Sequence, residues 1–286
     1  MFDGSNYVCI VGCPRSGTTW LQKQLAAHPC VATGQESQLF NVYIGPILRA
    51  WRGTLTQKRA VGLPGYVEEA TFFAALQQFV QTMLEPMLGG LERDRIFIDK
   101  TPCHVLYIPE ILELLPRTRF IHIIRDPRDV VASLLDAARS WSPRWIAAKT
   151  VRSAAAMWAE RVQRALAESA KLPRWQFHQV RYEDLHAAPA ETLRGCSEFL
   201  GLAWPDADIR RAVASNTIDV LRGGSGGTPI PLWGEAAKRE GSTVSEPAGF
   251  FRSGKIGSWK TDLSLAEKAY LWWALRRTMA VVGYRW

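Results

Sequence analysis

The chain has 286 residues, of which 47% are hydrophobic and 22% are charged. This composition excludes a disordered chain and is typical of a globular protein with a sizeable core. The net charge of +8 favours a polyanionic ligand such as a nucleotide, a nucleic acid or a sulfated polymer, although solvated surface lysines explain it equally well.

Cysteine usage and hydropathy narrow the cellular context. The five cysteines are dispersed, without a Cys-x-x-Cys pair or a histidine at metal-ligand spacing. We therefore expect a reduced, cytoplasmic chain without a structural metal. Since no apolar run approaches the about 20 residues of a membrane helix and no leader-like segment is recognised, neither membrane insertion nor export is expected.

The first third of the chain predicts one strand and one helix. Residues 7–11 (YVCIV) form an apolar run typical of a buried strand, and a helix is expected over 18–28, where Pro29 ends it. Residues 37–75 break this pattern, because they mix aromatic side chains with Gly and Pro. The aromatic residues of this stretch are Phe40, Tyr43, Trp51, Phe72 and Phe73.

The middle of the chain alternates between strands and helices. Strands are predicted over 95–99 (RIFID) and 119–125 (RFIHIIR), with a helix around 109–115 between them. Another helix is expected over 127–141, because Pro127 falls in its first turn, where the missing N–H costs nothing.

The remaining elements complete a recognisable fold class. A long helix is predicted over 150–170, a strand over 175–185 and a helix over 189–201 that Gly201 closes. Residues 222–249 are rich in Gly, Ser and Pro, so we expect a mobile loop that acts as a lid. Short strands separated by helices predict a single α/β domain over 1–286, with a central parallel sheet flanked by helices in three layers.

The stretch GCPRSGTTW (12–20) follows the first predicted strand and opens the first predicted helix. Gly12 and Gly17 occupy the glycine positions of a phosphate-binding loop, where backbone N–H groups and a helix N-terminus converge on an anion. Thr18 stands where NTP-binding loops have a lysine, and Arg15 supplies a cation from within the loop. The loop predicts a phosphate-bearing ligand but argues against NTP hydrolysis.

Four stretches resemble, in order, motifs of the sulfotransferase family, whose donor is 3′-phosphoadenosine 5′-phosphosulfate (PAPS). PRSGTTW (14–20) resembles its 5′-phosphosulfate loop, and IIRDPRDVVASLL (123–135) resembles its 3′-phosphate motif. VRYEDL (180–185) resembles the strand with a nucleotide-contacting Tyr, and FFRSGKIGSWK (250–260) resembles a late basic segment. The resemblance implies a P-loop-like fold, transfer of a sulfuryl group from PAPS to a hydroxyl with 3′-phosphoadenosine 5′-phosphate (PAP) as product, and no metal.

The resemblance also implies which residues bind the donor. Trp20 and Tyr182 would face the adenine and its phosphates, and Ser253 replaces a family lysine, which removes one cation. A planar guanidinium plus a hydroxyl suits the 3′-phosphate dianion. The implied 5′-phosphosulfate residues are Arg15, Ser16, Gly17, Thr18 and Thr19, and the implied 3′-phosphate residues are Arg125, Ser133, Arg252, Ser253 and Gly254.

Two plainer readings stay open for these residues. Trp20 is also explained as a core aromatic residue on an amphipathic helix, and Arg125 as a surface ion pair with Asp129.

Transfer to a hydroxyl needs a base within hydrogen-bond reach of the acceptor. Glu36, in HPCVATGQESQLF (28–40), resembles the base of the protein-tyrosine and carbohydrate sulfotransferase branches. Pro102 stands where small-molecule members have their histidine, and His104 lies two residues further on. We expect Glu36 as the base with His104 as the alternative, and the plainer reading of Glu36 is an ordinary loop carboxylate. By resemblance, Lys100 contacts the transferring sulfonate and Arg15 the leaving phosphate.

An ATP-dependent kinase is the alternative function, since Asp99 and Asp126 follow strand ends and could hold Mg²⁺. A nucleic-acid binder is disfavoured, because the twelve Trp are scattered without basic residues interleaved along one element. The acceptor is expected to be a hydroxyl of a small molecule, a carbohydrate or a lipid. The aromatic residues of 37–75, 141–145 and 222–249 would form its walls, and a homodimer stays open.

Overall fold

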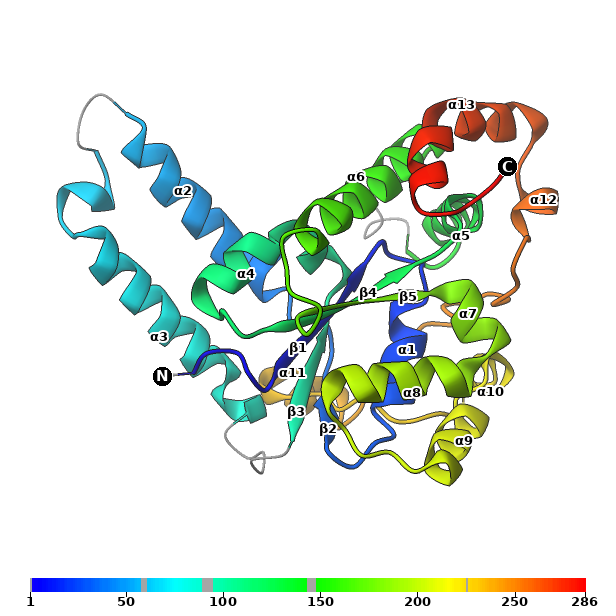
Figure 1. Cartoon of the computed structure of the whole chain (residues 1–286), viewed down its shortest axis with the longest axis horizontal. Helices are drawn as coiled ribbons and strands as arrows, with labels where there is room; N and C mark the ends of the chain where they lie inside the picture. The colour runs from blue at the N-terminus through cyan, green and yellow to red at the C-terminus, as the bar shows by residue number, and fades with distance from the viewer. Residues whose placement is uncertain (1, 58–60, 89–94, 143–147, 225) are drawn as a thin grey trace.

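The computed structural model describes residues 2–57, 61–88, 95–142, 148–224 and 226–286. Within them, five parallel strands form one sheet in the order β2-β3-β1-β4-β5 (Figure 1). The strands are β1 (Tyr7–Gly12), β2 (Val31–Thr33), β3 (Ile96–Lys100), β4 (Arg119–Ile124) and β5 (Phe177–Arg181). This confirms the predicted central parallel sheet.

Both faces of the sheet are covered, as a parallel sheet requires. Along β1, the side chains of Tyr7, Cys9 and Val11 enter one hydrophobic core, whereas Val8 and Ile10 enter another on the opposite face. The first core is closed by α3 (Glu69–Leu88) and α4 (Ile108–Leu114), and the second by α1 (Thr18–Leu25), α8 (Pro189–Leu200) and α9 (Asp206–Ser215). The predicted three layers are therefore present.

A third core joins helices beside the sheet. It is built around Trp158 by α5 (Pro127–Arg139), α6 (Val151–Ser169) and α13 (Leu265–Val281). Local sequence starts each helix: the Asp126 side chain caps α5, and Thr150 and Ser264 begin capping boxes on α6 and α13.

Some predicted boundaries were wrong. The helix expected over 18–28 ends at Leu25, and β2 was not predicted because it has three residues. The strand expected over 175–185 ends at Arg181, where α7 (Tyr182–Ala187) begins. Glu183 and Asp184 lie in the first turn of α7, where the helix dipole favours acidic side chains.

The stretch 37–75 is largely helical where it is described. It contains η1 (Leu39–Ile44), α2 (Gly45–Leu55), η2 (Leu63–Gly65) and the start of α3, while 58–60 lie outside the described residues. The Gly and Pro residues of this stretch argued against helices in the sequence. Pro46, however, falls in the first turn of α2, where it is tolerated. Figure 1 shows α2 and α3 extending away from the sheet.

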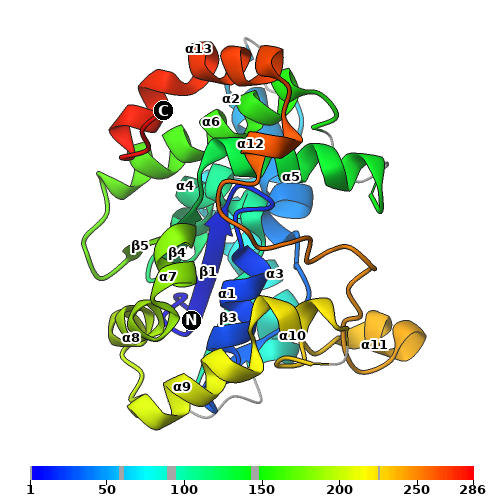
Figure 2. The ribbon, with the colours of Figure 1, turned by 90° about the vertical axis from the view of Figure 1, so that its right-hand side faces the viewer.

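The stretch 222–249 is partly ordered by contacts with the rest of the chain. After α10 (Ile218–Arg222) it contains α11 (Gly234–Glu240) and a bridge between Pro231 and Thr243. Trp233 Nε1 donates to the Thr33 carbonyl at 3.2 Å. Figure 2 shows α11 at the right-hand edge of the view, farther from α1 than α10 is. The mobility of the stretch stays a prediction.

Two short elements complete the described fold, η3 (Pro102–Tyr107) after β3 and α12 (Trp259–Asp262) before α13. No helix in the described part of the chain combines the length and apolar character needed to cross a membrane.

Candidate active site

The loop between β1 and α1 has the backbone of an anion site. Gly17 is the N-terminal cap of α1 with φ 94°, and no side chain caps the helix. A Cβ on Gly17 would lie 2.5 Å from the Tyr182 ring, so glycine is required both by conformation and by space. Arg15 adopts φ 72°, a left-handed conformation that costs free energy for a residue with a side chain. The N–H groups at the start of α1 are thus left without a side-chain cap.

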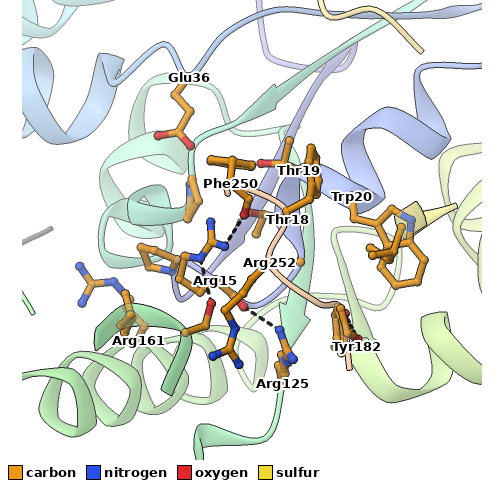
Figure 3. Close-up of a pocket in the computed structure, with 18 of the residues that line it drawn as sticks. Arg15, Thr18, Thr19, Trp20, Glu36, Arg125, Arg161, Tyr182, Phe250 and Arg252 are labelled. Atoms are coloured by element: carbon orange, nitrogen blue, oxygen red, sulfur yellow. Dashed lines mark hydrogen bonds between the residues drawn. The ribbon is translucent and has the colours of Figure 1, made fainter. Parts of the chain in front are cut away.

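A cavity of about 240 Å³ lies in front of this loop, at the carboxyl ends of the strands (Figure 3). Ligands bind at this edge of parallel sheets. The residues predicted to bind donor or acceptor that line it are Arg15, Gly17, Thr18, Thr19, Trp20, Glu36, Arg125, Ser133, Tyr182, Arg252, Ser253 and Gly254. Ser16 and Lys100 are buried and do not line the cavity. Motifs that are far apart in sequence are therefore brought together.

Arg125 is fixed in orientation inside the cavity. Its guanidinium lies 4.0 Å from the centre of the Tyr182 ring, and its Nη atoms donate to the carbonyls of Arg15 at 3.3 Å and Lys255 at 3.0 Å. Its Nε is buried and has no hydrogen-bond partner among the described residues. The predicted pair with Asp129 is present at 4.0 Å, but it is buried rather than on the surface.

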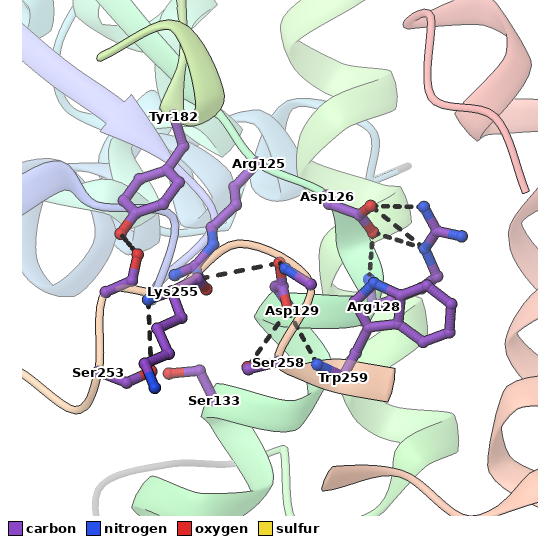
Figure 4. Close-up of polar contacts among 12 residues, drawn as sticks. Arg125, Asp126, Arg128, Asp129, Ser133, Tyr182, Ser253, Lys255, Ser258 and Trp259 are labelled. Carbon is purple, nitrogen blue, oxygen red and sulfur yellow. Dashed lines mark hydrogen bonds and ion pairs between the residues drawn. The ribbon is translucent and has the colours of Figure 1, made fainter. Parts of the chain in front are cut away.

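Asp129 mainly holds the late segment. Its carboxylate accepts hydrogen bonds from the backbone N–H groups of Gly257 at 2.8 Å and Trp259 at 3.1 Å (Figure 4). Because these backbone N–H groups occupy the Asp129 carboxylate, Arg125 keeps N–H donors for a ligand in the cavity.

Arg15 connects the loop to α5 and to the late segment. Its Nε donates to Ser133 Oγ at 3.1 Å and its Nη2 to the Phe250 carbonyl at 2.5 Å. Burial, and then the charges of Arg125 and Arg252, lower the pKa of Arg15 to about 10. These arginines repel one another, so an anion between them would stabilise the site.

Trp20 and Tyr182 form the opposite side of the cavity from Arg161 (Figure 3). Trp20 Nε1 donates to the Asn216 carbonyl at 2.8 Å, and its ring centre lies 5.5 Å from that of Tyr182. Trp20 is thus both 94% buried, as the core reading requires, and part of the cavity wall. The Tyr182 hydroxyl donates to the Gly254 carbonyl at 2.7 Å, which holds the late segment closed.

The first part of the late segment (250–260) lines the cavity. Gly254 adopts φ 64°, and a Cβ there would lie 2.7 Å from Ile218. Arg252 donates to Asp262 at 2.8 Å and to Ser258 Oγ at 2.6 Å, so it is held by protein partners beside the cavity.

Glu36 lies at the far end of the cavity and is oriented by two neighbours. Its Oε1 accepts a hydrogen bond from Lys100 Nζ at 2.6 Å, and its Oε2 accepts one from Gln38 Nε2 at 2.8 Å. Register explains how Lys100 reaches it: Lys100 ends β3 opposite Ile10 of β1, beside the loop. An ammonium and a carboxylate thus meet at the cavity wall.

His104 lies outside the cavity lining. It is fully buried, with its ring edge-on to Phe40 and its Nε2 accepting the Phe40 N–H at 3.3 Å. Burial lowers the pKa of His104 below its ordinary value. Because His104 is neutral, accepts a backbone hydrogen bond and does not line the cavity, it is poorly placed to act as the base.

The aspartates expected to hold Mg²⁺ in a kinase are engaged elsewhere. Asp99 accepts hydrogen bonds from three hydroxyl groups, and Asp126 caps α5 while pairing with Arg128 at 2.6 Å. In the described ranges, no group of three or more His, Cys, Asp or Glu side chains could hold a metal ion.

Sequence reasoning missed Arg161, which lines the cavity from α6. It is 92% buried, contacts Cys103 Sγ at 3.8 Å, and leaves its Nε without a partner among the described residues. A signal was available, since Arg161 lies on the buried stripe of α6 with Trp158 and Ala165. Glu246 was also missed; burial raises its pKa despite the opposing charges of Lys100 and Lys23.

Most of the expected acceptor walls do not line the cavity: none of the aromatic residues of 37–75 does, nor does any described residue of 222–249. Gln38 lines the cavity from 37–75, and Phe250 and Phe251 line it directly after 222–249. Trp141 lies against Arg15 and Phe250, whereas 143–147 are outside the described residues.

Comparison with known proteins assigns the chain to a family. The profile of the sulfotransferase family matches residues 8–206. The chain belongs to the sulfotransferase family. The expected family, with its P-loop-like fold, is therefore confirmed.

Curated relatives are protein-tyrosine sulfotransferases. This family member is 26% identical to protein-tyrosine sulfotransferase 2 of Gallus gallus over 199 residues, which cover 70% of this chain and 52% of that protein. It is 26% identical to protein-tyrosine sulfotransferase A of Caenorhabditis elegans over 208 residues, covering 71% and 53%. The chain thus spans about half the length of these relatives.

Solved structures share the fold. A mouse sulfotransferase complexed with PAP superposes with a TM-score of 0.62 at 14% identity, covering 97% of this chain and 85% of that one. A sulfotransferase domain from the curacin biosynthetic pathway gives 0.56 at 20% identity, covering 97% of both chains.

Proposed function

We propose that this sulfotransferase transfers a sulfuryl group from PAPS to a hydroxyl. The observation that carries the proposal is the gathering of Arg15, Arg125 and the uncapped N-terminus of α1 around one cavity. The buried Nε of Arg125, which lines the cavity, lacks a partner among the described residues, and a phosphate oxygen would satisfy it. The residues present therefore fit a ligand with two separate anionic groups.

Each end of the donor has its own residues. The α1 N–H groups with Arg15 suit the 5′-phosphosulfate, and Arg125 with Ser133 suits the 3′-phosphate that distinguishes PAPS from ATP. The Trp20 and Tyr182 rings offer flat apolar surfaces for the adenine. Arg252 would add charge at the 3′-phosphate side, although its present partner is Asp262.

We assign the proton transfer to Glu36. As the acceptor oxygen forms its bond to sulfur, Glu36 would take the hydroxyl proton, while the bond from sulfur to the phosphate oxygen breaks and its electron pair leaves with PAP. Lys100, 2.6 Å from Glu36, would hold the carboxylate. Its expected contact with the sulfonate stays a prediction, since Lys100 does not line the cavity. Arg15 would stabilise the charge that develops on the leaving phosphate.

We propose a phenolic hydroxyl as the acceptor, with tyrosyl side chains of polypeptides as the first candidates. The names of the curated relatives support this choice. The cavity also provides apolar surface for a phenyl ring, from Pro14, Pro102, Leu134, Met157 and Phe250. This replaces the broader expectation of a small-molecule, carbohydrate or lipid hydroxyl.

The test is transfer of radiolabelled sulfuryl from PAPS to tyrosyl peptides, simple phenols, sugars and aliphatic alcohols. Glu36→Gln should lower kcat about 100- to 10,000-fold, the usual contribution of a general base, while leaving the Kd for PAP unchanged. Glu113→Gln is the matched control, because the Glu113 carboxylate also pairs with a cation, Arg52 at 2.5 Å, but lies on α4 outside the cavity lining. Full turnover in Glu36→Gln would remove Glu36 from the mechanism, and transfer to sugars alone would overturn the phenolic acceptor.

A further inference from the structure

A buried network lies directly behind the Glu36–Lys100 pair. Two neighbouring residues of the β2–η1 loop contact two neighbouring residues of β3: Glu36 bonds Lys100 at 2.6 Å, and the Ser37 hydroxyl donates to Asp99 at 2.5 Å. The loop from Gln35 to Gln38 has no regular secondary structure, and Gln38 adopts φ 54°. These two adjacent links therefore fix a segment that helix or strand hydrogen bonds do not.

Asp99 is the centre of this network. Its side chain is fully buried, and besides Ser37 it accepts hydrogen bonds from the hydroxyls of Tyr7 at 2.5 Å and Thr101 at 2.7 Å. Burial and the Asp99 charge raise the pKa of Tyr7 well above its ordinary value, so its hydroxyl stays a donor. A buried carboxylate is costly unless hydrogen bonds satisfy it, and three hydroxyls from β1, the loop and the β3 end do so.

The same network holds the start of η1. Ser37 Oγ accepts the Leu39 N–H at 3.2 Å, and His104 Nε2 accepts the Phe40 N–H at 3.3 Å. His104 Nδ1 lies 3.6 Å from Asp99 Oδ2. The loop that carries Glu36 is thus tied on both sides of Gln38 to groups that stay fixed in the core.

We propose that Asp99 and Ser37 are positioning residues for Glu36, an inference that rests on the proposed function of that carboxylate. Neither residue lines the cavity, so neither contacts a substrate. Asp99 holds Ser37, and Ser37 holds the backbone next to Glu36, which keeps the carboxylate on Lys100 and toward the cavity. The sequence alone offered Asp99 as a Mg²⁺ ligand of a kinase. In this proposal Asp99 instead fixes the loop that carries Glu36.

Ser37→Ala tests the proposal, because it removes one hydroxyl and leaves the Asp99 carboxylate with two donors. We expect kcat for labelled sulfuryl transfer to fall about 10- to 100-fold, the usual effect of misplacing a catalytic group, with the Kd for PAP little changed. The Tm should fall modestly, because the Asp99 carboxylate and the Leu39 N–H each lose a hydrogen bond. Ser37→Thr should restore kcat. Ser197→Ala is the control, since Ser197 is also buried and bonded but lies on α8.

A double variant separates positioning from general damage. In the Glu36→Gln background, Ser37→Ala should cause no further loss of kcat, because Ser37 acts through Glu36. A full additional loss there, or unchanged kcat in Ser37→Ala alone, would overturn the proposal.

A crystal structure of Ser37→Ala gives a readout independent of activity. The proposal predicts that the Glu36 carboxylate moves away from Lys100 in this variant, and a retained pair at the original distance would contradict it. If the unmodified protein transfers no sulfuryl group, the proposed function fails, and the crystal structure still decides whether Ser37 positions Glu36.

Discussion

The Cζ atom of the Arg125 guanidinium lies over the ring of Tyr182, 4.0 Å from its centre, at the carboxyl edge of the sheet. The contact with the ring and the two carbonyl acceptors fix the guanidinium, so its remaining N–H groups, including that of Nε, are directed in advance of binding. Preorganised donors of this kind favour a ligand with an anionic group at one defined point.

Arg125→Ala should weaken binding of PAP by about 30- to 150-fold, the loss of about 2 to 3 kcal/mol expected for a hydrogen-bonded charge pair. Binding of adenosine 5′-phosphate, which lacks the 3′-phosphate, should change little. Calorimetric titration of both nucleotides measures the difference. Arg117→Ala is the control, since the Arg117 side chain is 61% exposed. Equal weakening for both nucleotides would show that Arg125 does not bind the 3′-phosphate.

Gly17→Ala should reduce both stability and donor affinity, because it combines a left-handed backbone with overlap on Tyr182. Gly201→Ala is a matched control, with φ 70° but no atom within 4 Å of the added Cβ. Denaturant unfolding should show a loss of about 1 kcal/mol for Gly201→Ala and about 2 to 4 kcal/mol for Gly17→Ala. Equal losses would mean that Tyr182 does not press on Gly17.

Stability should fall in mild acid because of His122, which burial holds neutral with its pKa lowered from 6.5 to about 4. Between these pH values the unfolded chain binds the proton and the folded chain does not, so acidification favours unfolding, by up to about 3 kcal/mol. His122→Leu should make this fall shallower when the free energy of unfolding is measured from pH 7 to pH 4. A pH dependence identical to that of the unmodified protein would exclude His122 as a source.

Arg161→Gln should raise the acceptor KM about tenfold without changing the Kd for PAP, because Arg161 lies across the cavity from Trp20 and Tyr182. Steady-state kinetics with a tyrosyl peptide measure this, with Arg164→Gln as the control, since Arg164 is 47% exposed and pairs with Glu168. Weakened PAP binding would place Arg161 on the donor side instead.

Much of the fold was predictable because its strands are continuous apolar runs. The sequence predicted β1, β3 and β4 to within one residue at each end, since both faces of these strands are buried. β5 was extended too far, because its alternating pattern continues into α7. α2 was missed because Gly45 and Pro46, which begin it, are also the residues of turns.

The site was predictable where local sequence encodes backbone shape. Gly17 and the strand-to-helix transition indicate an anion site without any tertiary information. Arg161 was not predicted, because its place in the cavity depends on how α6 packs against the β3 end. The role of Asp99 was likewise hidden, since its partners Tyr7 and Ser37 are distant in sequence.

The most direct test of the donor assignment is calorimetric titration of the unmodified protein with PAP and, separately, with ATP plus Mg²⁺. We predict that PAP binds at least about tenfold more tightly, because Arg125 and Ser133 have no phosphate to contact on ATP. Tighter binding of ATP with Mg²⁺ would contradict the account and favour a kinase.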